Sequence, residues 1–357
     1  MAEISIEQIR QLLTEINYPG FNRDIVSFGV LQEIDIRGSR INITLKFTTK
    51  SDDTKIRIKD DIFKLLTERL SGYEISVVET SPELKVTTGK ARDAQDPWAG
   101  HAPIPGIKNI IAVASGKGGV GKSTVSTNLA IALSQQGIKV GLMDSDIYGP
   151  SIPIMMGVEG RPMVTEDQKI LPMEKFGIKM MSMGFLVDSD SPLIWRGPLV
   201  MKAVEQFLRD VEWGELDVLV IDLPPGTGDA QLTLVQKTPL SGAVIVTTPQ
   251  EVALLDARKG LKMFQKVETK VLGIVENMSY YICPKCGDKS FIFGQNGGVR
   301  SAEQLGVSLL GQIPIEPEVT EAGDQGVPIV ARNPESASAK AFLEIAKKIA
   351  GDEALII

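Results

Sequence analysis

The stretch VASGKGGVGKST, residues 113–124, constrains the fold of this 357-residue chain more than any other. Residues Gly116–Ser123 match the pattern G-x-x-x-x-G-K-[ST], directly after an apolar run at 109–115 and directly before a helical pattern at 123–137. Glycines let backbone N–H groups turn inward around phosphate oxygens, and the N-terminus of the following helix adds partial positive charge. The stretch therefore predicts a phosphate-binding loop at the carboxyl end of a buried strand.

Short, continuous apolar runs alternate with helical patterns over the rest of this region. Such runs are typical of strands that are buried on both faces of a parallel sheet. Alternation of strands and helices implies right-handed crossovers, so we expect an α/β fold with a doubly wound, mostly parallel sheet. The expected strands are residues 109–115, 139–144, 217–222, 242–248 and 270–275, and the expected helices include 123–137, 251–267 and one that ends near Gly351.

The chain is too long for one small core, and its patterns divide it into three parts. We expect a small N-terminal α/β domain at residues 1–80, a linker rich in Gly, Ala and Pro at 81–106, and a large nucleotide-binding domain at 107–357. In the small domain, Ser5 and Gln8 have the spacing of a helix capping box. Apolar spacing then predicts a strand through Ile41, Ile43, Leu45 and Phe47, a helix with Ile58, Ile62, Leu65 and Leu66 on its inner face, and a strand at 73–80.

Each polar residue of the phosphate loop has an expected task. Lys122 would reach the β- and γ-phosphates, Ser123 would ligate Mg²⁺, and Thr124 would donate a hydrogen bond to the α-phosphate. The residues expected to contact the nucleotide are Gly116, Lys117, Gly118, Gly119, Val120, Gly121, Lys122, Ser123 and Thr124.

Three aspartates follow predicted strands. Asp222 ends the run 217–222, and Asp144 and Asp146 lie at the end of the run 139–144. Because parallel sheets bind ligands at the carboxyl ends of their strands, all three carboxylates fall on the edge that carries the phosphate loop. Asp222 in this position would hold Mg²⁺ through water. A strand-end aspartate also serves as a plain turn or helix cap, and that interpretation stays open for Asp144 and Asp146.

A second lysine, Lys117, lies inside the loop, where the general pattern does not require it. The variant GKGGVGKS resembles the deviant Walker A motif of the ATPase family that contains MinD, ParA, ArsA and the nitrogenase iron protein. The resemblance implies a homodimer in which Lys117 reaches the partner's nucleotide, with Lys117, Lys122 and Asp146 as the catalytic residues. It further implies that Asp146 orients the attacking water, that Asp144 helps to hold the metal shell, and that Asn277 reads the adenine edge and favours ATP.

The two cysteines of the chain, Cys283 and Cys286, form a CPKC pair. Tetrahedral thiolate sites need four ligands, yet there is no second pair, and the only histidine, His101, lies in the expected linker. From the residues alone, a zinc knuckle, half of an iron–sulfur site and a redox pair all remain open.

The large domain resembles the Mrp/ApbC family of P-loop iron–sulfur cluster carriers. The resemblance covers about residues 107–330 and rests on SGKGGVGKST, DSDIYGPSIP, WRGP, DLPPGTGD, NMSYYICPKCG and GQIPIEPEV, in this order. It implies that Cys283 and Cys286 of two subunits ligate one bridging [4Fe–4S] cluster, that ATP and Mg²⁺ bind, and that the cluster passes from an upstream assembly scaffold to apo-proteins. The N-terminal segment resembles an assembly-associated domain without its cysteine. The alternative is a positioning switch like MinD or ParA with a structural zinc site.

The net charge of −7 and the pI of about 5.1 disfavour a protein that binds nucleic acid or anionic lipid by electrostatics. Two cysteines in so long a chain indicate no disulfide framework and a reducing compartment. No apolar run is long enough for a membrane span, and the N-terminus has no signal-peptide core. We therefore expect a cytoplasmic protein that binds neither nucleic acid nor membrane.

Overall fold

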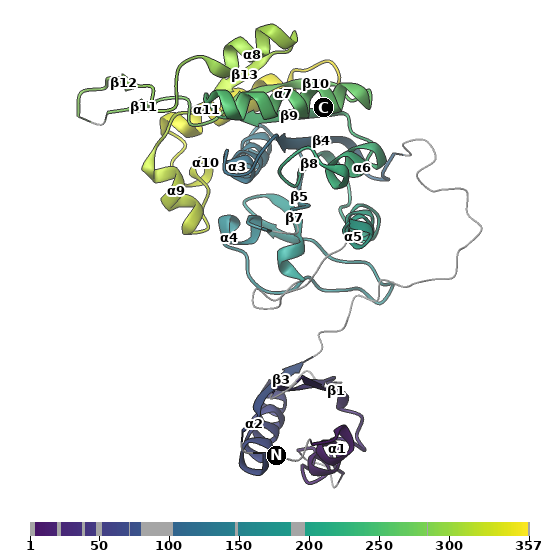
Figure 1. The fold of residues 1–357 in the computed structure, drawn as a ribbon. Helices are drawn as coiled ribbons and strands as arrows, with labels where there is room; N and C mark the ends of the chain where they lie inside the picture. Colours follow the sequence, from purple (N-terminus) through teal and green to yellow (C-terminus); the bar gives the residue numbers. More distant parts are fainter. Residues whose placement is uncertain are drawn as a thin grey trace. The chain divides into compact units, whose positions relative to one another are not determined.

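The computed structural model describes residues 4–19, 23–37, 40–47, 52–70, 72–79, 103–146, 149–186, 197–283 and 285–355 (Figure 1). The chain divides into two compact units, residues 1–92 and 93–357, each of which is described by itself. Most of the expected linker, with His101, lies outside the described residues, so the bounds of the linker stay a prediction.

The N-terminal unit is a small α/β domain. Its elements are α1 (Ile6–Leu13), β1 (Leu31–Arg37), β2 (Arg40–Leu45), α2 (Asp52–Arg69) and β3 (Glu74–Glu79). The sheet has the order β1-β2-β3, in which β2 pairs antiparallel with β1 and parallel with β3. The predicted helices and strands of this unit are confirmed, and β1 is an element that the sequence patterns above did not predict.

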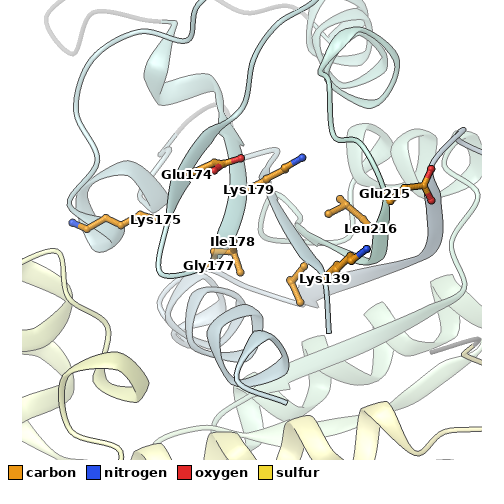
Figure 2. Close-up of a pocket in the computed structure, with 9 residues that line it drawn as sticks. Lys139, Glu174, Lys175, Gly177, Ile178, Lys179, Glu215 and Leu216 are labelled. Atoms are coloured by element: carbon orange, nitrogen blue, oxygen red, sulfur yellow. The ribbon is translucent and has the colours of Figure 1, made fainter. Parts of the chain in front are cut away.

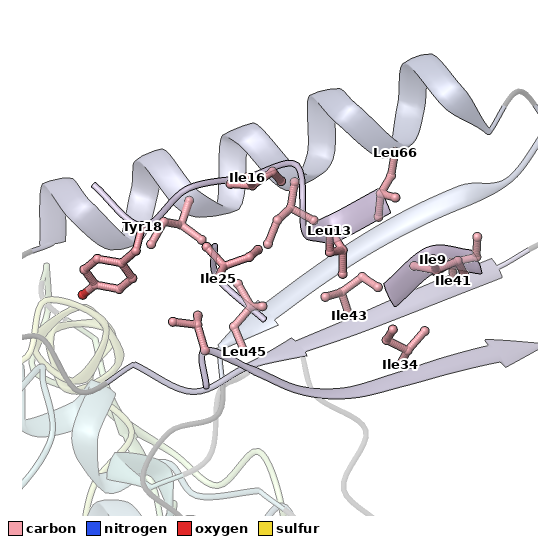
Figure 3. Packing of buried hydrophobic residues seen from close by; sticks show 13 residues of the cluster. Ile9, Leu13, Ile16, Tyr18, Ile25, Ile34, Ile41, Ile43, Leu45 and Leu66 are labelled. Carbon is pink, nitrogen blue, oxygen red and sulfur yellow. The ribbon is translucent and has the colours of Figure 1, made fainter. Parts of the chain in front are cut away.

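The core of this unit lies between the helices and one face of the sheet (Figure 3). Alternation in β2 has the expected result, since Ile41, Ile43 and Leu45 are all fully buried. The capping box is also confirmed: the Ser5 hydroxyl accepts from the Gln8 N–H, and the Gln8 side chain accepts from the Ser5 N–H. These two bonds satisfy donors that the first turn of α1 would otherwise leave unpaired.

The large unit is built on an eight-stranded sheet with the order β13-β10-β9-β4-β8-β5-β7-β6. All neighbours pair parallel except β6, the edge strand, which pairs antiparallel with β7. The strands are β4 (Ile107–Ser115), β5 (Val140–Asp144), β6 (Met173–Lys175), β7 (Ile178–Ser182), β8 (Leu216–Asp222), β9 (Gly242–Thr247), β10 (Val271–Glu276) and β13 (Leu309–Gln312). The expected α/β, mostly parallel sheet is confirmed, including its five predicted strands.

Helices cover both faces of this sheet. The connection from β4 through α3 (Lys122–Ser134) to β5 runs toward one edge, and that from β9 through α7 (Glu251–Lys266) to β10 runs toward the other. Right-handed crossovers in opposite directions place α3 and α7 on opposite faces, as Figure 1 shows. The remaining helices are α4 (Ile152–Met156), α5 (Gly197–Asp210), α6 (Asp229–Lys237), α8 (Gly297–Leu305), α9 (Pro317–Asp324), α10 (Ile329–Arg332) and α11 (Ala337–Ala350), with a 3₁₀ turn at Met183–Phe185.

Candidate nucleotide site and cysteine site

The loop between β4 and α3 has the backbone that its glycine pattern predicts. Gly119 and Gly121 have φ angles of +82° and +81°, a conformation that side chains rarely adopt. A Cβ on Gly116 would lie 2.2 Å from the backbone carbon of Asp256 in α7, so only glycine fits there. Helix α3 begins at Lys122 with Gly121 as its N-cap, and no side chain caps its free N–H groups. Loop and helix end together offer a phosphate-sized anion a set of backbone donors.

A buried ionic cluster lies directly beneath this loop. Lys122 Nζ is 2.7 Å from Asp222 Oδ2, and the two side chains are only 6% and 0% exposed. The hydroxyl of Ser123 donates to the same carboxylate oxygen at 2.6 Å, and the hydroxyl of Ser126 donates to the other at 2.6 Å. The lysine and the loop serine predicted to meet phosphate and Mg²⁺ therefore meet the strand-end Asp222.

Asp144 and Asp146 extend the cluster from β5. Asp144 stands opposite Asp222 in the parallel register and accepts hydrogen bonds from the Asp146 N–H and the Ser182 hydroxyl, both at 3.0 Å. Burial, and next the charge of Asp222, raise the pKa of Asp144 to about 7. Asp146 Oδ2 lies 3.8 Å from Lys122 Nζ. Three carboxylates thus gather around one ammonium group.

This donor set fits Mg²⁺ and a nucleotide. Carboxylate and hydroxyl oxygens are the ligands that Mg²⁺ prefers, and Asp222, Asp144 and Ser123 supply them side by side. A divalent cation would balance the excess of negative charge around Lys122. A Cβ on Gly118 or on Gly119 would meet nothing within 4 Å, so the loop is open on this side, where a phosphate would lie.

Asn277 joins this site from the end of β10. Its amide donates to the backbone oxygen of Val120 at 2.9 Å, and the side chain is almost fully buried. A Cβ on Gly121 would lie 2.2 Å from the Asn277 amide nitrogen, so the glycine makes room for this contact. Asn277 is thus fastened to the phosphate loop, while its role as the reader of adenine stays a prediction, as does the α-phosphate contact of Thr124.

Two serines that contact the cluster were not predicted. Ser126 lies one turn after Lys122 on α3, and its hydroxyl holds Asp222. Its signal is a polar residue four positions after the loop lysine, within the stretch of α3 from Val125 to Leu133 that is buried. Ser182 ends β7 and holds Asp144, a contact that depends on β7 lying beside β5, which no local pattern reveals.

Lys117 lies apart from this cluster. It is half-buried, and among the described residues it forms no ion pair. Among the described residues, Asp222 is therefore paired with Lys122 and not with Lys117.

The cysteines lie at the tip of a small hairpin that projects from the large unit, between β11 (Tyr281–Ile282) and β12 (Lys289–Ser290) (Figure 1). The Cys283 N–H donates to the Asp288 oxygen at 2.9 Å, and the Gly287 N–H donates to the Cys283 oxygen at 2.9 Å. The backbone N–H groups of Lys285 and Cys286 and the side chain of Cys286 lower the pKa of the Cys283 thiol. The knuckle is thus shaped to hold thiolate.

Two further features describe this cysteine site. Cys283 is half-exposed and Cys286 is exposed, and both are free thiols. In the described ranges, no group of three or more His, Cys, Asp or Glu residues is arranged to hold a metal ion. The pair therefore finds no third protein ligand within the part of one chain that the structure describes.

A separate recess of about 640 Å³ lies at the amino ends of the strands (Figure 2). Two of its three lysines are engaged with backbone oxygens: Lys179 Nζ donates to the Trp213 oxygen at 2.8 Å, and Lys175 Nζ donates to the Gly157 oxygen at 2.9 Å. Ligands of open parallel sheets bind at the carboxyl ends of the strands, so this recess lies at the opposite ends of the strands from the phosphate loop.

Comparison with known proteins agrees with this geometry. Residues 106–350 match the model of a family described as NUBPL iron-transfer P-loop NTPase, which covers more than half of the chain. The chain belongs to this family. Residues 6–80 match a second family, described as iron-sulfur cluster assembly protein, so the resemblances inferred from the motifs are confirmed.

Individual relatives extend the match of this NTPase to both units. The iron-sulfur cluster carrier protein of Synechocystis sp. is 46% identical over 353 residues, which cover 98% of each chain. A nucleotide-binding protein from Archaeoglobus fulgidus, solved with ADP, is 41% identical with a TM-score of 0.58 and covers 66% of this chain and 92% of its own. The cell division ATPase MinD of Pyrococcus furiosus has 26% identity, a TM-score of 0.51 and coverage of 68% and 98%.

None of the helices in the described part of this NTPase combines the length and the apolar character that a membrane-spanning helix requires.

Proposed function

We propose that this P-loop NTPase binds and hydrolyses ATP with Mg²⁺ and carries a labile [4Fe–4S] cluster that it transfers to apo-proteins. The observation that carries the proposal is the projecting knuckle: two thiols, one with a lowered pKa, with no third ligand in the described chain and six residues after the Asn277 that contacts the phosphate loop. Sequence identity of 46% to a protein named iron-sulfur cluster carrier supports the same conclusion.

The nucleotide site would work as follows. ATP supplies the phosphoryl group to be cleaved, and Mg²⁺ supplies charge that neutralises it. Lys122, which lies 2.7 Å from Asp222, would turn to the phosphates and reduce its contact with that carboxylate. Asp222, Asp144 and Ser123 would hold the metal, and Asp146 would orient the attacking water. Asn277 would read the adenine edge from its place beside Val120.

Two copies of the chain would complete both sites. Each subunit contributes Cys283 and Cys286, so that four thiolates meet at a two-fold axis, a ligand set that suits a [4Fe–4S] cluster. Lys117, which forms no ion pair among the described residues, would cross to the nucleotide of the partner. A cluster held by two residues from each chain at an exposed hairpin is suited to release, and nucleotide-driven opening of the dimer would control it.

Anaerobic reconstitution with iron and sulfide tests the cargo. We expect about four irons and four sulfides per dimer of the wild-type chain and none bound by Cys283→Ala. Tightly bound zinc that iron does not replace would instead make the knuckle a structural clamp. Transfer to an apo-protein is then followed with and without ATP, and normal delivery by a chain that cannot hydrolyse ATP would refute the coupling.

A further inference from the structure

The loop that carries the cysteines is closed at its base by one buried carboxylate. Glu276, the last residue of β10, is fully buried. The chain leaves the body of the domain just after it and returns at the start of α8, so the cysteine loop is defined here as residues 279–298. Ser279 at the outgoing end and Gly298 at the returning end both donate hydrogen bonds to Glu276, the former through its hydroxyl and the latter through its N–H.

A third donor ties this carboxylate to the neighbouring strand. Gln312 of β13 donates from its side-chain amide to Glu276 Oε1 at 2.7 Å and to the Ser279 hydroxyl at 3.0 Å. A Cβ on Gly298 would lie 2.8 Å from Glu276 Oε2, so the returning end needs a glycine to come this close. Hydrogen bonds from Ser279, Gly298 and Gln312 replace those to water that a buried carboxylate loses. Gly298 lies in the first turn of α8, where the helix dipole also favours a negative charge.

The same segment is also fastened to the phosphate loop. Asn277, the next residue, donates to the Val120 oxygen from its side chain and to the Thr247 oxygen from its N–H at 2.8 Å. The Ser279 N–H then donates to the Ile313 oxygen at 2.9 Å. Successive residues therefore contact the phosphate loop and the base of the cysteine loop, with little slack between them.

We propose that Glu276 is a positioning residue that couples the nucleotide site to the cysteine loop, so that the nucleotide state sets the exposure of Cys283 and Cys286. The inference rests on the proposed function in one respect, that ATP binds at the loop Asn277 contacts. When ATP displaces Val120 and Asn277, the shift passes through Glu276 to both ends of the cysteine loop. Glu276 transmits the shift because its carboxylate holds Ser279 and Gly298, the two ends of the cysteine loop, together.

Alkylation of the cysteines by iodoacetamide measures this coupling directly, since the chain has only two cysteines. The full-length protein is alkylated without nucleotide, with Mg²⁺–ADP and with Mg²⁺ and a slowly hydrolysed ATP analogue, and the modified chain is counted by mass spectrometry. We expect the wild-type rate to change about fivefold or more between the free and ATP-like states. In Glu276→Gln the change should fall to about twofold or less, with analogue affinity preserved.

The design separates coupling from stability. In Glu276→Gln, the side-chain NH₂ of residue 276 points at either the Gly298 N–H or the Gln312 side-chain NH₂. Both of these are hydrogen-bond donors, so one hydrogen bond is lost. The double variant Glu276→Gln with Gln312→Glu returns a carboxylate to the cluster and leaves the amide oxygen of residue 276 for Gly298, so it should restore the nucleotide effect. Asp217→Asn is the matched control, because Asp217 also accepts a backbone N–H, from Lys139 at the amino edge of the sheet, and should keep the wild-type response.

Three results would overturn the proposal. The first is a wild-type alkylation rate that does not change with nucleotide, and the second is a Glu276→Gln variant that keeps the full change. The third is a Glu276→Gln variant whose alkylation rate rises by the same factor in every nucleotide state, as expected if Glu276 only stabilises the loop. Alkylation needs no cluster. If the alkylation rate depends on nucleotide as expected but no cluster can be reconstituted, only the proposed iron–sulfur cargo is refuted. Intact reconstitution without coupling would refute only the role of Glu276.

Discussion

The nucleotide site and the cysteine site are opposite kinds of structure within one domain. The first lies where buried parallel strands end, and its charges are paired inside the chain, with Lys122 and Asp222 at 2.7 Å. The second lies on a hairpin whose two strands have only two residues each, and the turn from Lys285 to Ser290 is exposed throughout. The first is a buried ionic cluster, and the second is a pair of free thiols with no third protein ligand in the described part of the chain.

The difference shows where each site obtains its rigidity. A short isolated hairpin is marginal in water, and metal binding can supply the ordering that packing does not. The phosphate loop obtains its order from the strand and helix on either side of it and from its contact with Asn277. A rigid site suits repeated turnover, and an accessible pair of thiols suits the uptake and release of a cargo.

The largest expected effect is that of Lys122→Ala on hydrolysis. Loss of the only cation that pairs with Asp222 among the described residues removes the phosphate contact, and we expect phosphate release to fall about 100-fold or more. Cluster acquisition should survive, since the side chain of Lys122 contacts Asp222, Asp146 and Ser123 rather than the cysteine loop. Lys139→Ala serves as the control, because Lys139 lies just before β5, at the amino end of this strand. Hydrolysis at the wild-type rate would contradict the assignment of Lys122.

Cys283→Ala should have the opposite effect to Lys122→Ala. We expect cluster binding to be lost while ATP affinity stays within about twofold, because the half-exposed thiol lies on the hairpin, where its backbone bonds are with Asp288 and Gly287. Iron analysis and nucleotide titration of the same preparation measure both. Ser290→Ala, an exposed change in β12, should leave each quantity unaltered. A cluster retained by the alanine variant would show that the ligands lie elsewhere.

The raised pKa of Asp144 in the nucleotide site predicts that the stability of the large unit depends on pH. Its pKa is raised from 3.8 to about 7, so the folded state binds the proton more tightly than the unfolded state does. Stability from this group is therefore lost as the pH rises from about 4 to about 7.

Asp144→Asn should remove this loss. We expect the fall in the unfolding free energy between pH 5 and pH 8, without nucleotide, to be smaller in the variant by on the order of 1–3 kcal/mol. Denaturant unfolding of the large unit, followed through the buried Trp213, measures it. Cys283→Ala is the control that should keep the wild-type pH profile. An identical profile for the asparagine variant would show that Asp144 ionises normally.

The smallest effect is expected from a change in the N-terminal unit. Ser5→Ala removes one cap bond of α1 and should cost the N-terminal unit about 1 kcal/mol. Hydrolysis and cluster content should not change. Thermal unfolding with the neighbouring change Glu7→Gln as a control measures the cost. A drop in hydrolysis would reveal that the folding of the N-terminal unit affects the nucleotide site.

Local patterns alone determined much of this molecule. The apolar runs predicted five strands of the large sheet, the capping box predicted the start of α1, and the glycine pattern predicted the loop ahead of Lys122. These features depend on neighbours a few residues apart, through backbone freedom, side-chain period and helix-end donors. The edge strands β6 and β13 are short, which is why their weak patterns predicted nothing.

Only the tertiary structure decided which distant residues meet. Asp222 and Asp144 face each other because β5 lies beside β8, and Ser182 reaches Asp144 because β7 lies beside β5. Glu276 closes the cysteine loop because β13 and the start of α8 lie next to β10. Strand order is set by the packing of the whole core, and no short stretch of sequence contains it.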